Sequence, residues 1–204
     1  LWKERAAQPP KFDLISMMAH SEATQNLPLR EFIGTFGLLI VGGNDTTRNS
    51  MTGGLMAMIE HPAEVAKVRA DAGLLSSLVS ETIRYQTPVI HMRRTATRDA
   101  ELGGKAIAKG DKVVMWYVSG NRDEAVFERA DEFQIERANA RRHLSFGIGV
   151  HFCMGSRLAE MQLRVLWEET LSRFRAVEVV GAPRRVRSNF VKGYSYLPVR
   201  VHPW

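Results

Sequence analysis

The chain has a single cysteine, Cys153, among its 204 residues. One cysteine cannot close an intramolecular disulfide, and it excludes zinc and iron–sulfur sites that need several cysteines. Long hydrophobic runs are also missing. The uncharged stretch from Phe32 to Asn44 is much shorter than the roughly 20 residues that a helix needs to cross a bilayer. The sequence therefore predicts no transmembrane anchor. It shows no secretory signal, and because it begins at Leu1 we expect it to be part of a longer protein.

Repeats and low-complexity segments are likewise absent. Apolar residues make up 45% of the chain and charged residues 25%, with 16 Gly and 8 Pro, which excludes disordered, collagen-like and coiled-coil classes. The 28 Lys and Arg exceed the 22 Asp and Glu, so the net charge is +6. This excess permits a nucleic acid, an anionic lipid or an acidic protein as partner, and it does not choose among them.

One segment stands out for the lack of proline within it. Pro28 is suited to the start of a helix and Pro62 to its end, so the residues between them, Leu29–His61, are predicted to form one helix. At about 1.5 Å per residue such a helix approaches 50 Å. Its middle, IGTFGLLIVGG, is apolar on nearly all sides. We therefore expect this middle part to be buried.

The remaining pattern predicts a mainly α fold with a small β-sheet. Turn signals lie at Gly103–Gly104 and Lys109–Gly110, and a Gly193 turn suggests a hairpin in the tail. Asp131–Leu144 is charged and is expected to be irregular. The other predicted helices are Lys11–Ser21, Ala63–Asp71, Leu74–Tyr85, Asn121–Phe127 and Gly155–Arg173, and the predicted strands are Arg93–Thr97, Val113–Val118, Val177–Val180 and Leu197–Val201.

The cysteine lies in a glycine-rich loop, Phe146–Gly155, directly before a predicted helix. Its glycines, Gly147, Gly149 and Gly155, allow tight turns or close approach of the backbone to a flat group. The free amides of a helix N-terminus favour a thiolate, which would serve as a nucleophile or a metal ligand. The alternative is that Cys153 is a small buried hydrophobic residue.

A second unusual segment, Gly42–Thr47, reads GGNDTT within the long apolar helix. Glycine in a helix interior costs about 1 kcal/mol relative to alanine, and buried polar side chains must be paired or hydrated. One interpretation is a kinked helix whose polar groups bond to its own carbonyls. The other is a widened groove that admits a small ligand, with Thr46 and Asp45 handling protons beside it.

Two sets of charged residues complete the candidates. Glu81 and Arg84 are three residues apart on one helix and can form an ion pair, although most such pairs are solvated. Basic residues flank the cysteine loop and the helix after it, and the simplest interpretation of them is a solvated face. They are Arg141, Arg142, Arg157 and Arg164.

Two other functional classes are consistent with parts of the sequence. A nucleic-acid-binding module would use the basic charge, but its basic residues would be clustered, and here they are dispersed. A thiol hydrolase would pair Cys153 with His151, but a separation of two residues in a glycine loop is poor geometry for a nucleophile and its base.

Taken together, the motifs resemble the C-terminal half of a cytochrome P450. The loop matches the haem-ligand signature Phe-Gly-x-Gly-x-His-x-Cys-x-Gly at every defined position. GGNDTT resembles the oxygen-activating motif, and Glu81-Thr82-Ile83-Arg84 matches the Glu-x-x-Arg element. The resemblance implies that residues 1–204 are the C-terminal part of a single cytochrome P450 domain, whose N-terminal half is absent from the chain.

This resemblance implies haem b (iron protoporphyrin IX) as cofactor, with Cys153 as the axial thiolate ligand of the iron. Gly147, Gly149 and Gly155 would let the backbone approach the porphyrin, and Phe146 belongs to the same cofactor-binding loop. His151 and Arg94 match positions that contact the haem propionates, which a cation would pair with.

The family also supplies roles for the other motifs. Thr46 matches the threonine that hydrogen-bonds dioxygen or its ordered water, and Asp45 matches the acid that relays protons. Glu81, Arg84 and Arg137 would form a buried charged network that supports the fold and does not take part in catalysis. Apolar or small residues at the positions expected to line the substrate pocket are Leu38, Leu39, Gly42, Val89, Ile90, Phe190 and Val191.

Several strings, among them HMRRTATRD and SNFVKGY, are similar to the soluble bacterial alkane-hydroxylase branch. That similarity implies a cytoplasmic monooxygenase that hydroxylates the terminal carbon of medium-chain alkanes, using O2 and electrons from a ferredoxin and a ferredoxin reductase. The alternative is a hydroxylase of fatty acids, terpenes or another lipophile. Because half of the family's length is missing, we expect the isolated chain to be inactive.

Overall fold

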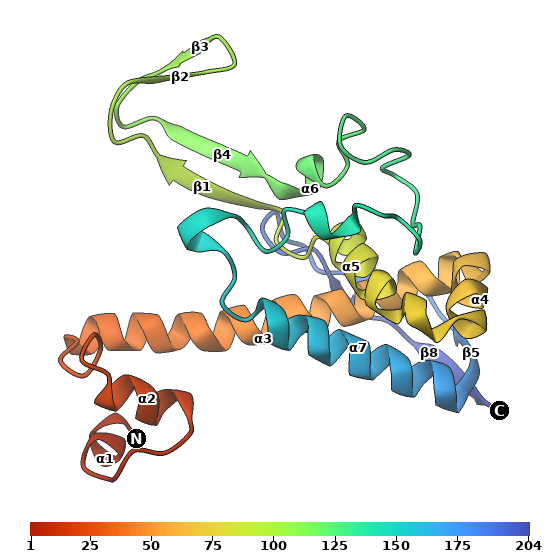
Figure 1. Ribbon diagram of the computed structural model, residues 1–204, viewed down its shortest axis with the longest axis horizontal. Coiled ribbons are helices and arrows are strands. Elements are labelled where there is room, and N and C mark those ends of the chain that lie inside the picture. Colours follow the sequence, from red (N-terminus) through yellow and green to blue (C-terminus); the bar gives the residue numbers. More distant parts are fainter. The chain divides into compact units, whose positions relative to one another are not determined.

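The computed structural model describes all residues, 1–204. Helices contain 47% of the residues and the strands are short, which confirms the predicted mainly α class. The chain divides into two compact units, Leu1–Asp45 and Thr46–Trp204. Figure 1 traces the helices α1 (Trp2–Ala6), α2 (Leu14–His20), α3 (Leu29–Glu60), α4 (Pro62–Ala70), α5 (Leu75–Gln86), α6 (Tyr117–Gly120) and α7 (Ser156–Arg173). None of the helices is both long and apolar enough to cross a lipid bilayer.

The first unit holds two short helices and the start of α3. Asp13 caps α2, because its side chain accepts a hydrogen bond from the Ser16 N–H at 2.8 Å. This cap explains why α2 begins at Leu14 and not at the predicted Lys11. The chain also contains a first helix, α1, that the sequence pattern did not predict. The ring centroid of Trp2 in α1 lies 4.1 Å from that of Phe32 in α3.

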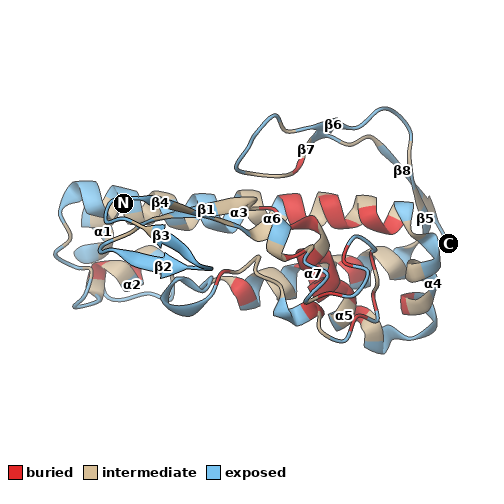
Figure 2. Ribbon diagram, turned by 90° about the horizontal axis from the view of Figure 1, so that it is seen from above, coloured by how far each residue is buried: buried red, intermediate tan, exposed pale blue.

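Helix α3 runs from Leu29 to Glu60, nearly the predicted span. The expectation that its apolar middle is buried is wrong for this structure. Leu38 is 71% exposed and Val41 is 61% exposed, and the buried residues lie only between Asn49 and Met58. Within α3, the buried residues, red in Figure 2, lie only in the C-terminal part of the helix. The physical reason is that the hydrophobic core is assembled around that part.

This core belongs to the second unit and joins α3, α4, α5 and α7. Trp167 of α7 and Leu78 of α5 are almost completely buried in it. The helices approach closely at Gly54, where a methyl group would lie 2.5 Å from Thr82 Cγ2 and 2.9 Å from Trp167 Cζ2. Glycine is therefore required at this contact.

The strands form four separate two-stranded antiparallel sheets, where one small sheet was expected. They pair as β1 (His91–Thr95) with β4 (Lys112–Trp116), β2 (Ala100–Leu102) with β3 (Lys105–Ile107), β5 (Phe174–Val179) with β8 (Val199–Pro203), and β6 (Arg184–Arg185) with β7 (Tyr194–Tyr196).

The predicted turn at Gly103–Gly104 joins β2 to β3, with φ of 58° and 74° at the two glycines. The tail strands pair as predicted, but Gly193 does not make the turn. Gly193 is buried where an added methyl group would collide with the side chain of Asn49 in α3. Its missing side chain thus allows close packing.

The predicted helix at Asn121–Phe127 is wrong. The helix in this region is α6, which ends at Gly120, and turns follow it. The Asp123 side chain accepts a hydrogen bond from the Ala125 N–H at 2.9 Å, and Asn121 makes long-range side-chain bonds. Asn and Asp side chains commonly compete in this way with helical hydrogen bonding. Irregular structure follows through the 3₁₀ turn η2 (Ala140–Arg142), as expected for Asp131–Leu144.

Candidate functional site

The cysteine loop lies between residue 146 and the start of α7. Cys153 is exposed and forms no disulfide. Its N–H donates a hydrogen bond to the Phe146 carbonyl at 2.8 Å, which closes the loop, and its own carbonyl accepts from the Ser156 N–H at 3.3 Å. The thiol therefore stands at the entrance to an 18-residue helix, as the sequence predicted.

Two glycines give the loop its conformation. Gly147 and Gly149 have φ of 68° and 63°, in the left-handed region that other residues rarely adopt. Gly147 is also buried, and a methyl group there would lie 3.3 Å from the His151 carbonyl oxygen. Gly155 is the N-cap residue of α7. The nearest atom to a methyl group at this position would be the Cys153 sulfur, at 3.9 Å.

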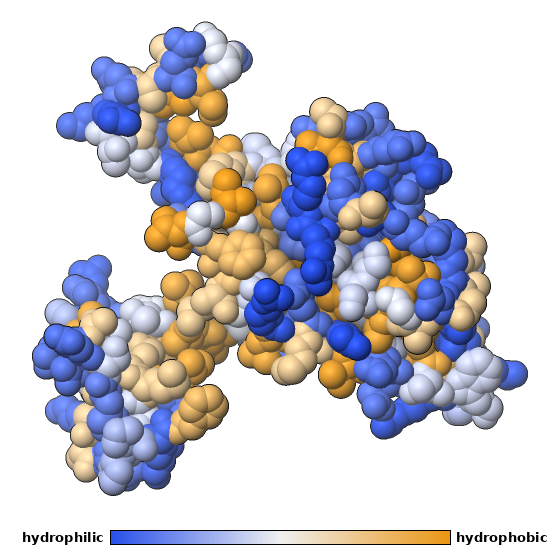
Figure 3. All heavy atoms as spheres, viewed as in Figure 1, coloured by the Kyte–Doolittle hydropathy of each residue, from blue (hydrophilic) through white to orange (hydrophobic).

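Apolar side chains of this loop face solvent. Val150 is 95% exposed, Met154 81%, Ile148 72% and Phe152 53%. Figure 3 colours such hydrophobic residues orange on the molecular surface. Phe146, in contrast, is half-buried against the hydrophobic core. An apolar surface of this kind beside an exposed thiol is suited to a flat hydrophobic ligand.

The two residues matched to propionate contacts have different settings. His151 is exposed in the 3₁₀ turn η3 (Gly149–His151), within the cysteine loop. Arg94 is half-buried in β1, and its guanidinium donates to the Arg93 carbonyl at 3.0 Å. Most of the donors of Arg94 remain for an anionic group.

The structure brings Glu81, Arg84 and Arg137 together in a buried cluster. Arg84 donates two hydrogen bonds of 2.7 Å to the Glu81 carboxylate, and Arg137 lies 3.3 Å from the same carboxylate. Both Glu81 and Arg84 are fully buried. The other donors of Arg84 reach the carbonyls of Asn121, Ala130 and Glu132 at 2.7–3.0 Å. All five guanidinium N–H groups are thus used, which stabilises a charge far from water.

Thr46 and Asp45 follow one another in α3 and are half-buried. The Thr46 carbonyl accepts a hydrogen bond from the Ser50 hydroxyl at 2.9 Å, one helical turn later. Gly42 lies one turn before Thr46 and is exposed. The motif is therefore helical throughout, and Ser50, just after it, bonds locally to a helix carbonyl.

Four of the expected substrate-lining residues come from two segments that pair with each other. Val89 and Val191 form an antiparallel β-bridge, and the Ile90 N–H donates to the Phe190 carbonyl at 2.9 Å. Phe190 is 43% exposed. The remaining three, Leu38, Leu39 and Gly42, are in α3 within the first unit, where Leu38 and Gly42 are exposed and Leu39 is half-buried.

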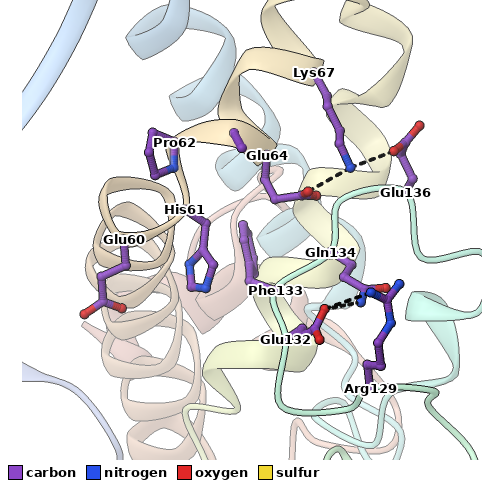
Figure 4. Close-up of a pocket in the computed structure, with 11 residues that line it drawn as sticks. Glu60, His61, Pro62, Glu64, Lys67, Arg129, Glu132, Phe133, Gln134 and Glu136 are labelled. Atoms are coloured by element: carbon purple, nitrogen blue, oxygen red, sulfur yellow. Dashed lines mark hydrogen bonds and ion pairs between the residues drawn. The ribbon is translucent and has the colours of Figure 1, made fainter.

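One pocket of the structure is lined by none of the predicted site residues. It has a volume of about 710 Å³ and lies between the end of α3, the start of α4 and residues 129–136, as Figure 4 shows. Its charges are internally paired, with Lys67 2.7 Å from Glu64 and 2.8 Å from Glu136. Burial would raise the pKa of Glu64, but hydrogen bonds from Lys67 and the Ile135 N–H lower it overall.

Sequence reasoning missed one buried and two half-buried polar residues near these elements, Asn121, His143 and Lys192. Asn121 is fully buried and bonds to Leu144 and Ser145, just before the cysteine loop. Burial lowers the pKa of His143 to about 4 and that of Lys192 to about 8. No local pattern singles these residues out, because their partners are distant in the sequence.

Comparison with known proteins decides the family. Residues 3–192 match the family model described as Cytochrome P450. The chain belongs to the cytochrome P450 family. This membership favours the haem-thiolate interpretation of Cys153 over the thiol hydrolase and the nucleic-acid-binding module.

Individual relatives agree with this result. The chain is 46% identical to linalool 8-monooxygenase from Pseudomonas putida, over all of this chain and 50% of that protein. It is 40% identical to methyl-branched lipid omega-hydroxylase from Mycobacterium bovis, over 92% of this chain and 44% of the other. Among solved structures, cytochrome P450-153 from Novosphingobium aromaticivorans superposes with a TM-score of 0.93 and 52% identity, over 98% of this chain and 50% of that one. The chain thus spans about half the length of these relatives.

Membership of the family implies haem b as cofactor. The residues present fit this group. The exposed thiol of Cys153 could serve as a ligand for iron, and the exposed apolar side chains of the loop suit a macrocycle. Arg94 and His151 would offer cationic or hydrogen-bonding groups to two propionates.

Proposed function

We propose that this chain is the C-terminal part of one haem-thiolate monooxygenase domain that inserts one oxygen atom of O2 into a C–H bond of a lipophilic substrate. The observation that carries the proposal is the exposed Cys153 thiol on a positive-φ glycine loop at the start of α7. Haem held by a cysteine thiolate activates dioxygen, because the thiolate donates electron density that favours O–O cleavage.

Within this proposal, the loop residues hold the cofactor. Cys153 would bind the iron through its sulfur, and the bond from its N–H to the Phe146 carbonyl holds the cysteine backbone at the mouth of α7. Because Gly147, Gly149 and Gly155 have no side chains, they would leave room for the macrocycle. Glu81, Arg84 and Arg137 hold the fold beneath the loop and make no contact with substrate.

Thr46 and Asp45 supply protons in the proposed reaction. The Thr46 hydroxyl would hydrogen-bond dioxygen or its ordered water and pass a proton to it. The Asp45 carboxyl would take up a proton from solvent and replace the one that the hydroxyl gave up. A hydroxyl backed by an acid suits proton delivery, since each group can exchange a proton with its neighbour. Their adjacent places in α3 support this assignment.

The proposed substrate is a medium-chain alkane, hydroxylated at its terminal carbon. Apolar residues at Val89, Ile90, Phe190 and Val191 support it, because a hydrocarbon needs no charged group to hold it. The second candidate is a hydroxylase of fatty acids, terpenes or another lipophile. Relatives named for linalool and for methyl-branched lipid favour this alternative. A panel of alkanes and fatty acids of increasing length, with the position of the product hydroxyl determined, distinguishes the two.

The proposed electron donors are a ferredoxin and its reductase, with the protein in the cytoplasm. Exposed arginines near the cysteine loop support an acidic docking partner. They are Arg141, Arg142, Arg157 and Arg164. Complementary charges of this kind increase the association rate more than the affinity.

The decisive experiment is the absorbance spectrum of the reduced, carbon-monoxide-bound protein. It is recorded on this chain and on a version completed with a relative's N-terminal half. In the completed protein we expect a thiolate-type Soret band that disappears in Cys153→Ala and changes to an imidazole type in Cys153→His, whereas the isolated chain should not hold haem stably. Met154→Ala, at the neighbouring exposed position, should retain the band. Absence of the band from the folded, completed protein would refute the role of Cys153.

A further inference from the structure

Asn121 is the centre of a group of hydrogen bonds to Thr87 and to the residues just before the cysteine loop. The residue is fully buried directly after α6. Its Oδ1 accepts a hydrogen bond from the Leu144 N–H at 2.7 Å. Its Nδ2 donates to the hydroxyls of Thr87 and Ser145, both at 2.9 Å. Both hydrogens and the oxygen of the amide therefore have partners.

Only one orientation of this amide satisfies its neighbours. The Thr87 hydroxyl donates to the Arg84 carbonyl at 2.6 Å, and the Ser145 hydroxyl donates to the Ile83 carbonyl at 2.8 Å. Each hydroxyl has one hydrogen, so both can only accept from Asn121. The Leu144 N–H, in contrast, can only donate to it. An asparagine meets all three demands, and an aspartate of the same shape meets only the last.

The residues that Asn121 holds lead directly into the loop. The Leu144 carbonyl accepts from the Gly147 N–H at 2.8 Å, and the Phe146 carbonyl accepts from the Cys153 N–H at 2.8 Å. On its other side, the backbone carbonyl of Asn121 accepts from Arg84 at 2.7 Å. These hydrogen bonds, together with the backbone of residues 144–147, join the buried ion cluster to the backbone of Cys153.

We propose that Asn121 is a positioning residue for Cys153. It transmits the rigidity of the Glu81–Arg84 cluster to the loop by fixing Leu144 and Ser145, which in turn fixes the Phe146 carbonyl that holds the Cys153 N–H. The inference rests on the proposed role of Cys153 as the haem ligand, because a ligand must be held in place to bind iron in a defined geometry.

The test is site-resolved amide hydrogen exchange on the 204-residue chain without haem. In Asn121→Ala, the amides of Gly147 and Cys153 should exchange about tenfold faster. Local opening of the loop would then no longer require breaking the hydrogen bonds from Asn121 to Leu144 and Ser145. The amides of Leu163 and Trp167 in α7 should keep their wild-type rates. Asn121→Asp retains only the bond from Leu144 and should give a smaller acceleration at the same two amides.

Asn139→Ala is the matched control. The Asn139 side chain also donates to a backbone carbonyl, that of Val126 at 2.7 Å, but it makes no bond to residues 144–153. It should leave the exchange of Gly147 and Cys153 unchanged. If Asn121→Ala does not fold, Ser145→Ala tests the same path, because it removes the link to the Ile83 carbonyl.

Unchanged exchange at Gly147 and Cys153 in the Asn121 variants would overturn the proposal. Equal acceleration throughout α5 and α7 would also overturn it, since the residue would then support the whole fold. A different measurement tests the proposed function. The proposed function would be refuted if the completed protein without substitutions lacked the thiolate-type Soret band. Exchange in the absence of haem does not depend on that band.

Discussion

Two glycines of α3 differ in what surrounds them. A methyl group at Gly54 would collide with Thr82 and Trp167, whereas nothing lies within 4 Å of the same position at Gly43. Both residues are helical, so both reduce helix propensity by a similar amount. Their effects on stability should therefore have opposite signs, which is decided by tertiary packing alone.

We predict that Gly54→Ala destabilises the chain by about 1–3 kcal/mol, the usual cost of overpacking a core. Gly43→Ala should stabilise it by about 0.5–1 kcal/mol, because alanine has the higher helix propensity. Urea unfolding followed by circular dichroism measures both. A Gly54→Ala variant as stable as wild type would show that α3 does not pack against α5 and α7 as described.

His143 makes the fold sensitive to acid. Burial lowers the pKa of His143 to about 4, with a smaller contribution from the charge of Arg84. The unfolded chain has a histidine pKa near 6.5, so between about pH 6.5 and pH 4 the unfolded state binds more protons than the folded state. Stability contributed by the neutral imidazole is therefore complete above this window and falls as the pH is lowered through it.

The predicted loss between pH 7 and pH 4 is about 3 kcal/mol for this group. His143→Phe keeps an aromatic ring beside Phe146 but does not titrate, so its stability should fall less over the same range. The free energy of unfolding in urea at a series of pH values provides the comparison. If the free energy of unfolding depended on pH equally in wild type and His143→Phe, His143 would not be the group responsible.

At the scale of elements, α5 is held by charge as much as by apolar contact. The buried Glu81 carboxylate receives Arg84, Arg137 and the Gln134 N–H, so α5 is joined to the irregular segment after α6. That segment forms turns and no regular α-helix or strand, and its carbonyls accept hydrogen bonds from Arg84. The cluster thus orders a region that local propensity leaves irregular.

We predict that Arg84→Met destabilises the chain by about 3–5 kcal/mol, because it leaves a buried carboxylate and several carbonyls without this partner. The exposed pair Arg200–Glu178 is the control, since its contact of 2.8 Å lies at the surface. Arg200→Met should cost at most about 1 kcal/mol. Urea unfolding measures both effects, as shifts in the midpoint concentration with an unchanged dependence of the unfolding free energy on urea. Similar losses in the two variants would contradict the special role of the buried cluster.

The elements also show how far local patterns reach. Pro28 and Pro62 predicted α3 to within one residue at its end, and the helix after the cysteine loop was predicted equally well. The three-residue strands β2 and β3 were missed, since such short segments show no alternation of their own. The helix predicted at Asn121–Phe127 was wrong because long-range side-chain bonds outweighed helix propensity there.

At the scale of the whole molecule, the net charge of +6 becomes informative once the family is known. Arg157 is 91% exposed at its side chain and Arg164 is exposed seven residues later, on the same face of α7. If an acidic electron carrier docks on this face, these charges attract it over several ångströms in a salt-dependent way.

We predict that reversing either charge, as Arg157→Glu or Arg164→Glu, slows reduction of the intact enzyme by roughly tenfold at low ionic strength, with the difference decreasing as salt is added. Arg173→Glu, at the opposite end of α7, is the control and should have little effect. Stopped-flow reduction kinetics measure the rates. An unchanged rate at low salt in both variants would place the docking surface elsewhere.

The sequence by itself determined the family, the long helix, the cysteine loop and the Glu81–Arg84 pair, because each is encoded by residues close together in the chain. Only the tertiary structure decided which part of α3 is buried, why Gly193 must lack a side chain, and that Asn121 joins the ion cluster to the cysteine loop. These features depend on partners distant in sequence, since burial and buried hydrogen bonds arise only when separate segments meet.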